Sequence, residues 1–264
     1  MNNEKPKDLT GYKEWLKKEH KIEISAQTET YYDSVTAKIK RDFENSDCWG
    51  ALTDNLAEFD SQYYSQKGYH LLLTDAKPEL YIKPFESFLG KTLRKNVLQN
   101  QNWPAEPDDG WIFPNKWYSR IDDIIRTLIV VKYLDGVEFM VDKISSICRQ
   151  HSMPCHSFFE AKEEGYYAAH FYAEREFEIP RPNWDTEKII VSIEIQITTQ
   201  LQEAIRELLH KYYEERRQGI GEEDIKWQWN YKSDEFVANY LGHILHYVEG
   251  MIMEIREKQK EEIT

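Results

Sequence analysis

The stretch that decides the fold is IIVSIEIQITTQ, residues 189–200. Apolar side chains occupy every second position from Ile189 to Ile197, so an extended chain would place them all on one face. Glu194 and Gln196 fall on the other face. The pattern predicts a β-strand with one buried face. Its polar face has two interpretations: it faces water at the edge of a sheet, or it forms the floor of an active site.

The rest of the chain supplies partners for this strand. Residues 166–179 also alternate and would pair with it across the Pro-containing turn at 180–186, and the β-branched run at 128–133 predicts a buried strand. A helical turn is expected at 121–127 and a loop rich in Pro, Asp, Asn and Trp at 99–118. Apolar spacings of three and four predict helices at 11–20, 25–46, 49–67, 79–100, 137–150, 200–217 and 234–262. The sequence therefore predicts an α/β (α+β) fold, with a small mixed sheet flanked by helices.

Composition limits the classes of function. A chain of 264 residues with 41% hydrophobic and 14% aromatic residues can bury a core. It has no run of about 18 apolar residues and no apolar signal segment at the N-terminus, so we expect a cytoplasmic protein without membrane contact. The net charge of −13 argues against broad, non-specific nucleic-acid binding. Local basic patches remain at Lys17-Lys18 and at Lys83, Lys91, Arg94 and Lys95.

The cysteines do not form a disulfide framework, because Cys48, Cys148 and Cys155 are too few and odd in number. Cys148, His151, Cys155 and His156 together would offer four zinc ligands. Their spacing matches no common zinc template, however, and Cys148 falls on the apolar face of a predicted helix. A zinc site is therefore not expected.

Polar residues that suit a nucleotide site recur along the chain. Lys83, Ser87 and Lys91 are spaced by four and share one side of a helix, and Asp122 and Asp123 precede the buried strand. Carboxylates bind Mg²⁺, cations bind phosphates and an aromatic ring stacks on a base. Singly, a lysine row is usually solvated and a strand tyrosine is usually core. Tyr166 and His170 share the polar face of the strand predicted at 166–179, and Gly165 and Lys162 precede them.

Four motifs stand in a characteristic order. They are K-x-x-x-S-x-x-x-K (Lys83, Ser87, Lys91), D-[IL] (Asp123-Ile124), K-x-x-G-Y-x-x-x-H (Lys162, Gly165, Tyr166, His170) and E-I-Q-I-x-T (Glu194 to Thr199, with Gln196). In these motifs, residues 83–199 resemble the synthetase domain of RelA/SpoT-type enzymes, the stringent-response pyrophosphokinases. The resemblance favours the active-site interpretation of the polar face of residues 189–200.

The resemblance implies a sheet of nucleotidyltransferase-like type and an ATP-dependent pyrophosphokinase. Such an enzyme transfers the β,γ-pyrophosphate of ATP to a ribose 3′-hydroxyl and releases AMP. By family analogy, Asp123 and Glu194 would bind Mg²⁺, Glu194 would activate the acceptor hydroxyl, and Tyr166 would stack on the acceptor base. The phosphates of ATP would be bound by Lys83, Ser87 and Lys91, with Arg94 and Arg126. Further acceptor contacts would come from Lys162, Gly165, His170 and Gln196.

The chain departs from the family pattern at several positions. Tyr81 stands where the family usually has an arginine that helps to sandwich adenine, although a tyrosine ring can also stack. Thr198 replaces the arginine of E-I-Q-I-R-T. The W-x-x-x-E-H pattern that follows is reduced to His210, with Ile205 and Leu209 at the other two positions. These losses weaken the case for an acceptor that carries its own 5′-diphosphate or triphosphate.

The best prediction for the acceptor is the 3′-CCA end of tRNA, which a toxic branch of the small alarmone synthetases modifies to inhibit translation. The segments KTLRKNV and RTLIVVKYLDGVEF are similar to that branch, and Arg94 and Lys95 would serve a tRNA backbone. The net charge of −13 favours the alternative, GDP or GTP as acceptor for (p)ppGpp synthesis. A non-catalytic module that binds nucleotide is a third interpretation.

The predicted organisation has three parts: a helical extension at 1–72, the synthetase-like domain at 73–217 and a helical extension at 218–264 that packs on it. We expect a stand-alone synthetase without a hydrolase region. A toxin would require an antitoxin as partner. The role of residues 1–72 and the oligomeric state stay open, and the apolar residues of the last helix suit packing on the domain or on a dimer partner.

Overall fold

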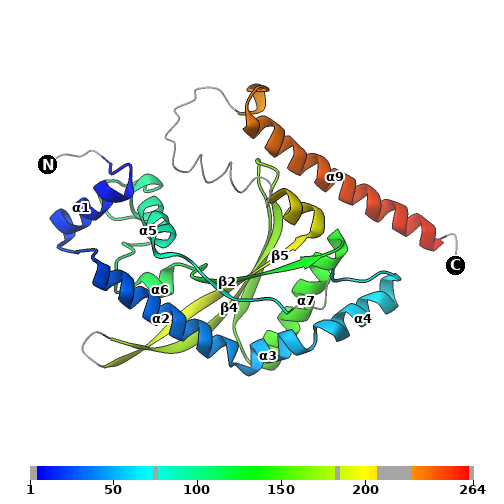
Figure 1. The fold of residues 1–264 in the computed structure, drawn as a ribbon, viewed down its shortest axis with the longest axis horizontal. Helices are drawn as coiled ribbons and strands as arrows, with labels where there is room; N and C mark the ends of the chain where they lie inside the picture. Colours follow the sequence, from blue (N-terminus) through cyan, green and yellow to red (C-terminus); the bar gives the residue numbers. More distant parts are fainter. Residues whose placement is uncertain (1–4, 74–76, 182–184, 207–226, 262–264) are drawn as a thin grey trace. The chain divides into compact units, whose positions relative to one another are not determined.

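A computed structural model describes residues 5–73, 77–181, 185–206 and 227–261. One sheet of five strands has the order β1-β2-β5-β4-β3 (Figure 1). The strands are β1 (Tyr81–Ile82), β2 (Ile125–Val131), β3 (Cys155–Ala161), β4 (Tyr167–Pro180) and β5 (Thr186–Thr199). The helices are α1 (Leu9–His20), α2 (Ala26–Glu44), α3 (Asp47–Asp54), α4 (Leu56–Lys67), α5 (Phe85–Leu93), η1 (Arg94–Leu98), α6 (Trp117–Arg120), α7 (Leu134–Gln150), η2 (Trp227–Trp229) and α9 (Asp234–Glu261).

The stretch at 189–200 forms most of β5, which lies between β2 and β4 in the strand order. It is therefore a central strand, and the edge interpretation of its polar face is wrong. Glu194 is only 3% exposed, and the side chains of Thr198 and Thr199 are also buried. The alternation of apolar and polar residues thus does not mark a face open to water. Both faces are covered along the second half of the strand.

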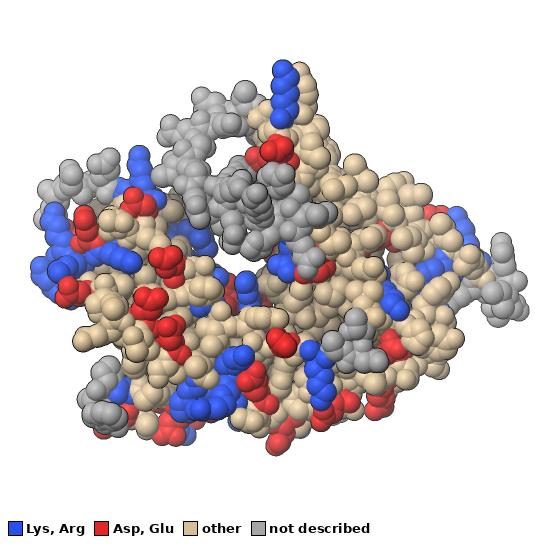
Figure 2. Space-filling view, viewed as in Figure 1, with Lys and Arg blue, Asp and Glu red and all other residues tan. Residues whose placement is uncertain are grey.

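The chain divides into two compact units, which are described separately. Unit 1 comprises Met1–Trp49, Leu80–Arg126 and Ala173–Glu194, and unit 2 comprises Gly50–Glu79, Thr127–Tyr172 and Ile195–Thr264. Strands β2, β4 and β5 each contribute residues to both units. Lys and Arg side chains lie among Asp and Glu side chains on the face seen in Figure 2, and the chain as a whole has a net charge of −13.

Helix α2 contributes a row of buried side chains to unit 1. Its buried side chains recur at three and four, and Ser25 and Thr28 form a capping box at its N-terminus. Tyr32 on this helix is fully buried and contacts the rings of Phe85 and Phe88 on α5, with centroids at 5.2 and 4.8 Å. The core of this unit therefore fixes α5, which carries Lys91 and follows Lys83 by two residues, the two lysines predicted to bind phosphate.

The terminal helix α9 of unit 2, red in Figure 1, buries a polar face. Asn239, Gly242, Glu249 and Arg256 are buried, whereas the apolar side chains of Val237, Leu241, Ile244, Tyr247, Met251 and Ile255 are exposed. In the described part of the chain α9 therefore contacts the rest of unit 2 through its polar face, and the apolar side chains considered for packing on the domain or on a dimer partner do not make that contact. Arg256 anchors the helix, because its guanidinium lies 4.2 Å from the Tyr69 ring, 4.1 Å from the Tyr133 ring and 3.3 Å from the Asp135 carboxylate.

Several local predictions need correction. The helix expected at 79–100 begins only at Phe85, after the short strand β1, and continues as the π-helix η1. The helix expected at 49–67 is interrupted at Asn55, and residues 122–124 form a turn rather than a helical turn. Strand β3 was not predicted, because its side chains are exposed on both faces and leave no alternation to detect. Residues 200–206 are helical as expected, whereas Leu209 and His210 lie outside the described residues.

No helix in the described ranges combines the length and the apolar character needed to cross a membrane.

Candidate active site

A buried ion cluster in unit 1 brings together three of the predicted residues. The Lys83 ammonium donates to Oδ2 of Asp123 at 2.9 Å, and the Lys91 ammonium lies 2.9 Å from Oδ1. The side chains of Lys83 and Asp123 are only 11% and 15% exposed, and that of Lys91 is 23% exposed. We call Asp123, Lys83, Lys91 and the nearby Arg126 the Asp123 cluster.

The fold places this cluster through the backbone as well as through side chains. Lys83 follows β1, and its N–H donates to the carbonyl of Ile124 at 2.8 Å. The buried Tyr32 hydroxyl donates to the carbonyl of Lys83 at 2.8 Å. Lys91 lies two helical turns further on α5, so it reaches the same carboxylate from another direction. The cluster is therefore tied to α2, α5, β1 and β2 at once.

The protonation equilibria show how strongly these charges interact. Burial would raise the pKa of Asp123, but the ammonium groups of Lys91 and Lys83 outweigh it and hold that pKa below its usual range. Burial lowers the pKa of Lys83; the Asp123 carboxylate opposes this shift, and the charges of Lys91 and Arg126 add to it. Several cations thus gather around one carboxylate in a partly desolvated place.

Arg126 and Tyr81 are direct neighbours across the ladder between β1 and β2, where Tyr81 pairs with Arg126 and Ile82 with Ile125. The side chains of such antiparallel pairs have Cβ atoms about 4.5–5.5 Å apart. The ring of Tyr81 is 56% exposed, although it occupies the position where an adenine-binding arginine was expected. A flat ring and a guanidinium therefore stand side by side at the end of the Asp123 cluster.

Glu194 supplies a second carboxylate in unit 1. It lies on β5, the hydrogen-bonded neighbour of β2, whose first residue follows Asp123 by two positions. Both carboxylate oxygens of Asp123 are paired with lysine ammonium groups in this structure, Oδ2 with Lys83 and Oδ1 with Lys91, each at 2.9 Å. Mg²⁺ is typically bound by one or two carboxylates together with substrate phosphates and water, so this donor set fits it. No group of three or more His, Cys, Asp or Glu side chains that could hold a metal occurs among the described residues.

The K-x-x-G-Y-x-x-x-H motif in unit 2 forms the hairpin turn between β3 and β4, residues 162–166. The N–H of Gly165 donates to the carbonyl of Lys162, and Gly165 has a φ of 77°, which favours glycine. The Lys162 ammonium lies 5.0 Å from the Tyr166 ring centroid. The Tyr166 hydroxyl and Nε2 of His170 are 3.3 Å apart. The four motif residues are thus brought together on one short loop and the strand that follows.

Helix α9 holds this loop by direct backbone contact. A Cβ added to Gly165 would lie 2.4 Å from the Asn239 carbonyl oxygen, and one added to Gly242 would lie 2.3 Å from the Gly165 carbonyl oxygen. His243 adds two hydrogen bonds: Nε2 lies 2.8 Å from the Glu163 carbonyl, and Nδ1 lies 2.8 Å from the Tyr167 hydroxyl. Because Nε2 faces a carbonyl it must donate, so neutral His243 accepts from Tyr167 at Nδ1. Residues 162–167 are therefore fixed by a helix outside the motif.

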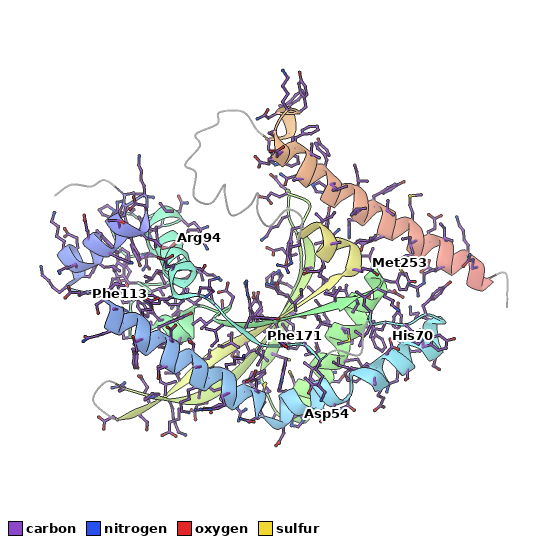
Figure 3. All side chains as sticks on the ribbon, viewed as in Figure 1. Asp54, His70, Arg94, Phe113, Phe171 and Met253 are labelled. Atoms are coloured by element: carbon purple, nitrogen blue, oxygen red, sulfur yellow. The ribbon has the colours of Figure 1, made fainter. Side chains whose placement is uncertain are left out.

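The remaining predicted residues are less tightly placed. Ser87 is exposed on α5, and Arg94, labelled in Figure 3, is half-buried at the start of η1. Gln196 is half-buried on β5 in unit 2. Thr198, which stands at the family's arginine position, donates through Oγ1 to the carbonyl of Tyr167 at 3.0 Å. Its side chain therefore supports β4 and does not supply a charge.

Sequence reasoning missed several supporting residues. Glu160 lies 3.0 Å from Nε2 of His170, and Tyr32 and His243 hold Lys83 and the 162–166 loop. Gly242 in the middle of a helix was the one available signal, because an interior glycine costs about 1 kcal/mol relative to alanine and often marks close packing.

The cluster considered for zinc does not form a site. Cys148 is buried on α7, as its apolar position suggested, and all three cysteines are free. His156 on β3 stacks on the ring of Tyr172 at 5.1 Å instead.

Glu249 on α9 provides a pH-dependent test of how the helix is held. It is buried and accepts a hydrogen bond from the Thr199 hydroxyl, and burial raises its pKa above 4.5. The free energy of unfolding therefore falls as pH rises from 4.5 to the folded-state pKa of Glu249, and the loss is complete above that pKa. We expect Glu249→Gln to raise the melting temperature at pH 8 and to raise it less at pH 4.5. Glu257→Gln, an exposed change on the same helix, is the control, and an unchanged or lower melting temperature of Glu249→Gln at pH 8 contradicts the expectation.

Comparison with known proteins addresses the fold. No protein-family model matches the sequence, and no curated protein matches it. The structure of a GTP pyrophosphokinase family protein from Streptococcus pneumoniae matches with a TM-score of 0.53 and 17% identity, over 90% of this chain and 97% of that one. The fold is that of the small alarmone synthetases. Small alarmone synthetase 1 from Bacillus subtilis matches with TM-scores of 0.51 bound to its product pppGpp and 0.50 bound to AMPCPP, at 14% identity over 89% of this chain and 97% of that one.

The small alarmone synthetase fold confirms the predicted fold class, a mixed sheet flanked by helices. At this level of identity the likeness concerns the fold alone. The assignment of an activity therefore rests on the residues described above.

Proposed function

We propose that this protein is an ATP-dependent pyrophosphokinase of the RelA/SpoT type. It transfers the β,γ-pyrophosphate of ATP to a ribose 3′-hydroxyl and releases AMP. The observation that carries the proposal is the Asp123 cluster, in which two lysines hold one buried carboxylate at 2.9 Å each. An excess of buried cations beside a carboxylate suits a site that receives phosphates and a metal ion together.

The cluster exchanges partners when ATP binds. The ammonium groups of Lys83 and Lys91 turn from Asp123 to the phosphate oxygens, where their charge counters the charge that develops on the transferred group. Asp123 is thereby released to hold Mg²⁺ together with Glu194. When bound, Mg²⁺ polarises the phosphate oxygens and orients the transferred group. Ser87 and Arg94 provide further contacts to the phosphate chain.

Adenine binds at the end of β1. The exposed ring of Tyr81 and the guanidinium of Arg126 stand next to each other across the ladder, and both can stack on a purine. Tyr81 thus takes over the stacking role of the arginine that the family pattern has there. The known complex of small alarmone synthetase 1 with AMPCPP supports an adenine nucleotide as donor for this fold.

Glu194 acts as the general base. It lies on a central strand with little freedom to move, and its carboxylate takes the proton from the acceptor 3′-hydroxyl. The hydroxyl oxygen then forms a bond to the β-phosphorus, while the bond from that phosphorus to the α,β-bridging oxygen breaks and AMP leaves. In unit 2, Tyr166 stacks on the acceptor base, and Lys162, His170 and Gln196 orient the acceptor.

We propose the 3′-CCA end of tRNA as the acceptor, which makes the protein a cytoplasmic toxin that inhibits translation and requires an antitoxin. Thr198 supports this choice, because its hydroxyl donates a hydrogen bond to the carbonyl of Tyr167 and carries no charge that could bind the 5′-phosphates of a free nucleotide. GDP or GTP is the second candidate, supported by pppGpp in the product complex of small alarmone synthetase 1 and by the net charge of −13.

The acceptor is identified by competition. Purified protein is incubated with Mg²⁺, ATP labelled at the γ-phosphate, and an equimolar mixture of GDP, GTP and bulk tRNA. We expect label on tRNA, removed by ribonuclease. Label on a guanine nucleotide alone would replace tRNA by the second candidate, and no label on any acceptor, with ATP shown to bind, would contradict pyrophosphokinase activity.

A further inference from the structure

Unit 2 carries a continuous row of aromatic side chains that begins at the 162–166 loop. The centroids of Tyr166 and His170 are 6.0 Å apart, and those of His170 and Phe158 are 5.3 Å apart. Phe158 is followed by Tyr172 at 6.0 Å, and Tyr172 by His156 at 5.1 Å. From His170 to His156, neighbouring rings are inclined by only 12–21°. We call His156, Phe158 and Tyr172 the aromatic row.

The row lies on one face of neighbouring strands. His156 and Phe158 are two residues apart on β3, and His170 and Tyr172 are two residues apart on β4, so each pair points to the same side of the sheet. β3 is the last strand in the order, and Phe158 is 46% exposed. Phe158 and His156 are thus exposed, where a folded protein usually buries an aromatic ring.

Burial of the core does not explain these rings. Phe171, labelled in Figure 3, is the fully buried aromatic of the same strand β4, whereas Phe158 and His156 remain exposed. Exposed aromatic side chains on a sheet are a recurrent platform for unpaired bases, because every base has a π-face that can stack on them.

We propose that the aromatic row binds the unpaired nucleotides that precede the acceptor nucleotide, so that the acceptor is the 3′ end of a single-stranded polynucleotide. The inference rests on the proposed function, in which Tyr166 stacks on the acceptor base. The row continues directly from that ring through His170, whose Nε2 lies 3.3 Å from the Tyr166 hydroxyl. Bases upstream of the acceptor stack on Phe158 and then on Tyr172 and His156. A free mononucleotide has no such bases and does not use the row.

Phe159 provides a matched control on the same strand. It follows Phe158 directly, points to the opposite face of β3 and is 61% exposed. Phe158→Ala and Phe159→Ala each remove one phenylalanine ring from β3, but only Phe158→Ala removes a member of the aromatic row. Phe158→Tyr keeps a ring and serves as the rescue variant.

The test measures binding of a six-nucleotide RNA ending in CCA, labelled at its 5′ end, by fluorescence anisotropy. All variants carry Glu194→Gln so that binding is separated from transfer. We expect Phe158→Ala to weaken RNA binding about tenfold, the loss of one stacked base, while Phe159→Ala and Phe158→Tyr bind like the parent. GDP binding should be the same in all of them, and thermal melting confirms that each variant is folded.

The proposal is overturned if the parent does not bind the RNA, or if the two alanine variants bind it equally. It is also overturned if Phe158→Ala changes the sedimentation of the protein and leaves RNA binding intact, because the row would then be an interface between copies of the chain. If one of these results is found but the wild type transfers label to GDP or GTP, the proposed pyrophosphokinase activity still stands. If the aromatic row binds RNA but no acceptor receives label, the proposed function is refuted and RNA binding by the row still stands.

Discussion

Asp123→Asn is expected to lower the rate of pyrophosphate transfer by about 1,000-fold or more. The variant keeps the shape of the side chain but loses the negative charge that would hold Mg²⁺ in the proposed reaction. It also leaves the ammonium groups of Lys83 and Lys91 together without an anion, with side chains only 11% and 23% exposed. An uncompensated buried charge of this kind destabilises a protein by about 3–5 kcal/mol.

The stability effect of Asp123→Asn should depend on pH. Because the lysines hold the pKa of Asp123 below 3.8 in the folded protein, the ion pairs stabilise it fully above that value and are lost as pH falls through the folded-state pKa. The difference in melting temperature between wild type and variant should therefore be full at pH 7 and should shrink in strong acid.

Single-turnover rates at a temperature where both proteins are folded separate catalysis from stability. Asp122→Asn, which removes the same charge from the neighbouring residue, is the control and should keep most of the activity. If Asp123→Asn retained a tenth of the wild-type rate, or if both variants lost activity equally, the role assigned to Asp123 would be wrong.

Gly242→Ala should also produce a large effect, although Gly242 lies outside every motif. Its new Cβ would come within 2.3 Å of the Gly165 carbonyl oxygen and 3.1 Å of the Gly165 Cα, so either α9 or the 162–166 loop must move. We expect the KM for the acceptor to rise tenfold or more, and stability to fall by about 1–3 kcal/mol from overpacking. ATP binding should not change, because the Asp123 cluster belongs to the other unit.

Gly250→Ala on the same helix is the matched control, since no atom lies within 4 Å of its added Cβ. Alanine is the better helix former, so this variant should be stabilised by about 1 kcal/mol and should keep its acceptor KM. The positioning role of α9 is refuted if the two variants behave alike, or if Gly242→Ala changes kcat and the KM for ATP but leaves the acceptor KM untouched.

The sequence predicted the parts of this molecule that depend on local patterns. The alternation in residues 189–200 predicts β5, which the structure confirms. The four motifs single out Asp123, Lys83 and Lys91 as site residues, and the structure brings these three side chains together, although their ion pairs were not predicted. The same patterns cannot show which other elements of the fold cover each face of the strand. Alternation was compatible with an edge strand, and only the strand order reveals that β5 is central.

Contacts between segments far apart in the chain escaped prediction. Gly242 and Gly165 approach each other closely although they are 77 positions apart, and no local pattern in the sequence predicts this contact. The apolar residues of α9 suited packing on the domain or on a dimer partner, and the pattern did not decide between them. The helix instead buries Asn239 and Glu249, because the surface it contacts is a glycine-bearing loop and the polar end of β5. Tertiary partners, rather than helical periodicity, decide which face of this helix is buried.

The most direct test of the account is the identity and amount of the nucleotide that leaves ATP. Wild-type protein is incubated with ATP, Mg²⁺ and its acceptor, and AMP, ADP and modified acceptor are quantified together. The account predicts one AMP for each acceptor modified, no AMP without acceptor, and loss of both products in Glu194→Gln. Release of ADP, AMP that forms without any acceptor, or an active Glu194→Gln variant would contradict it.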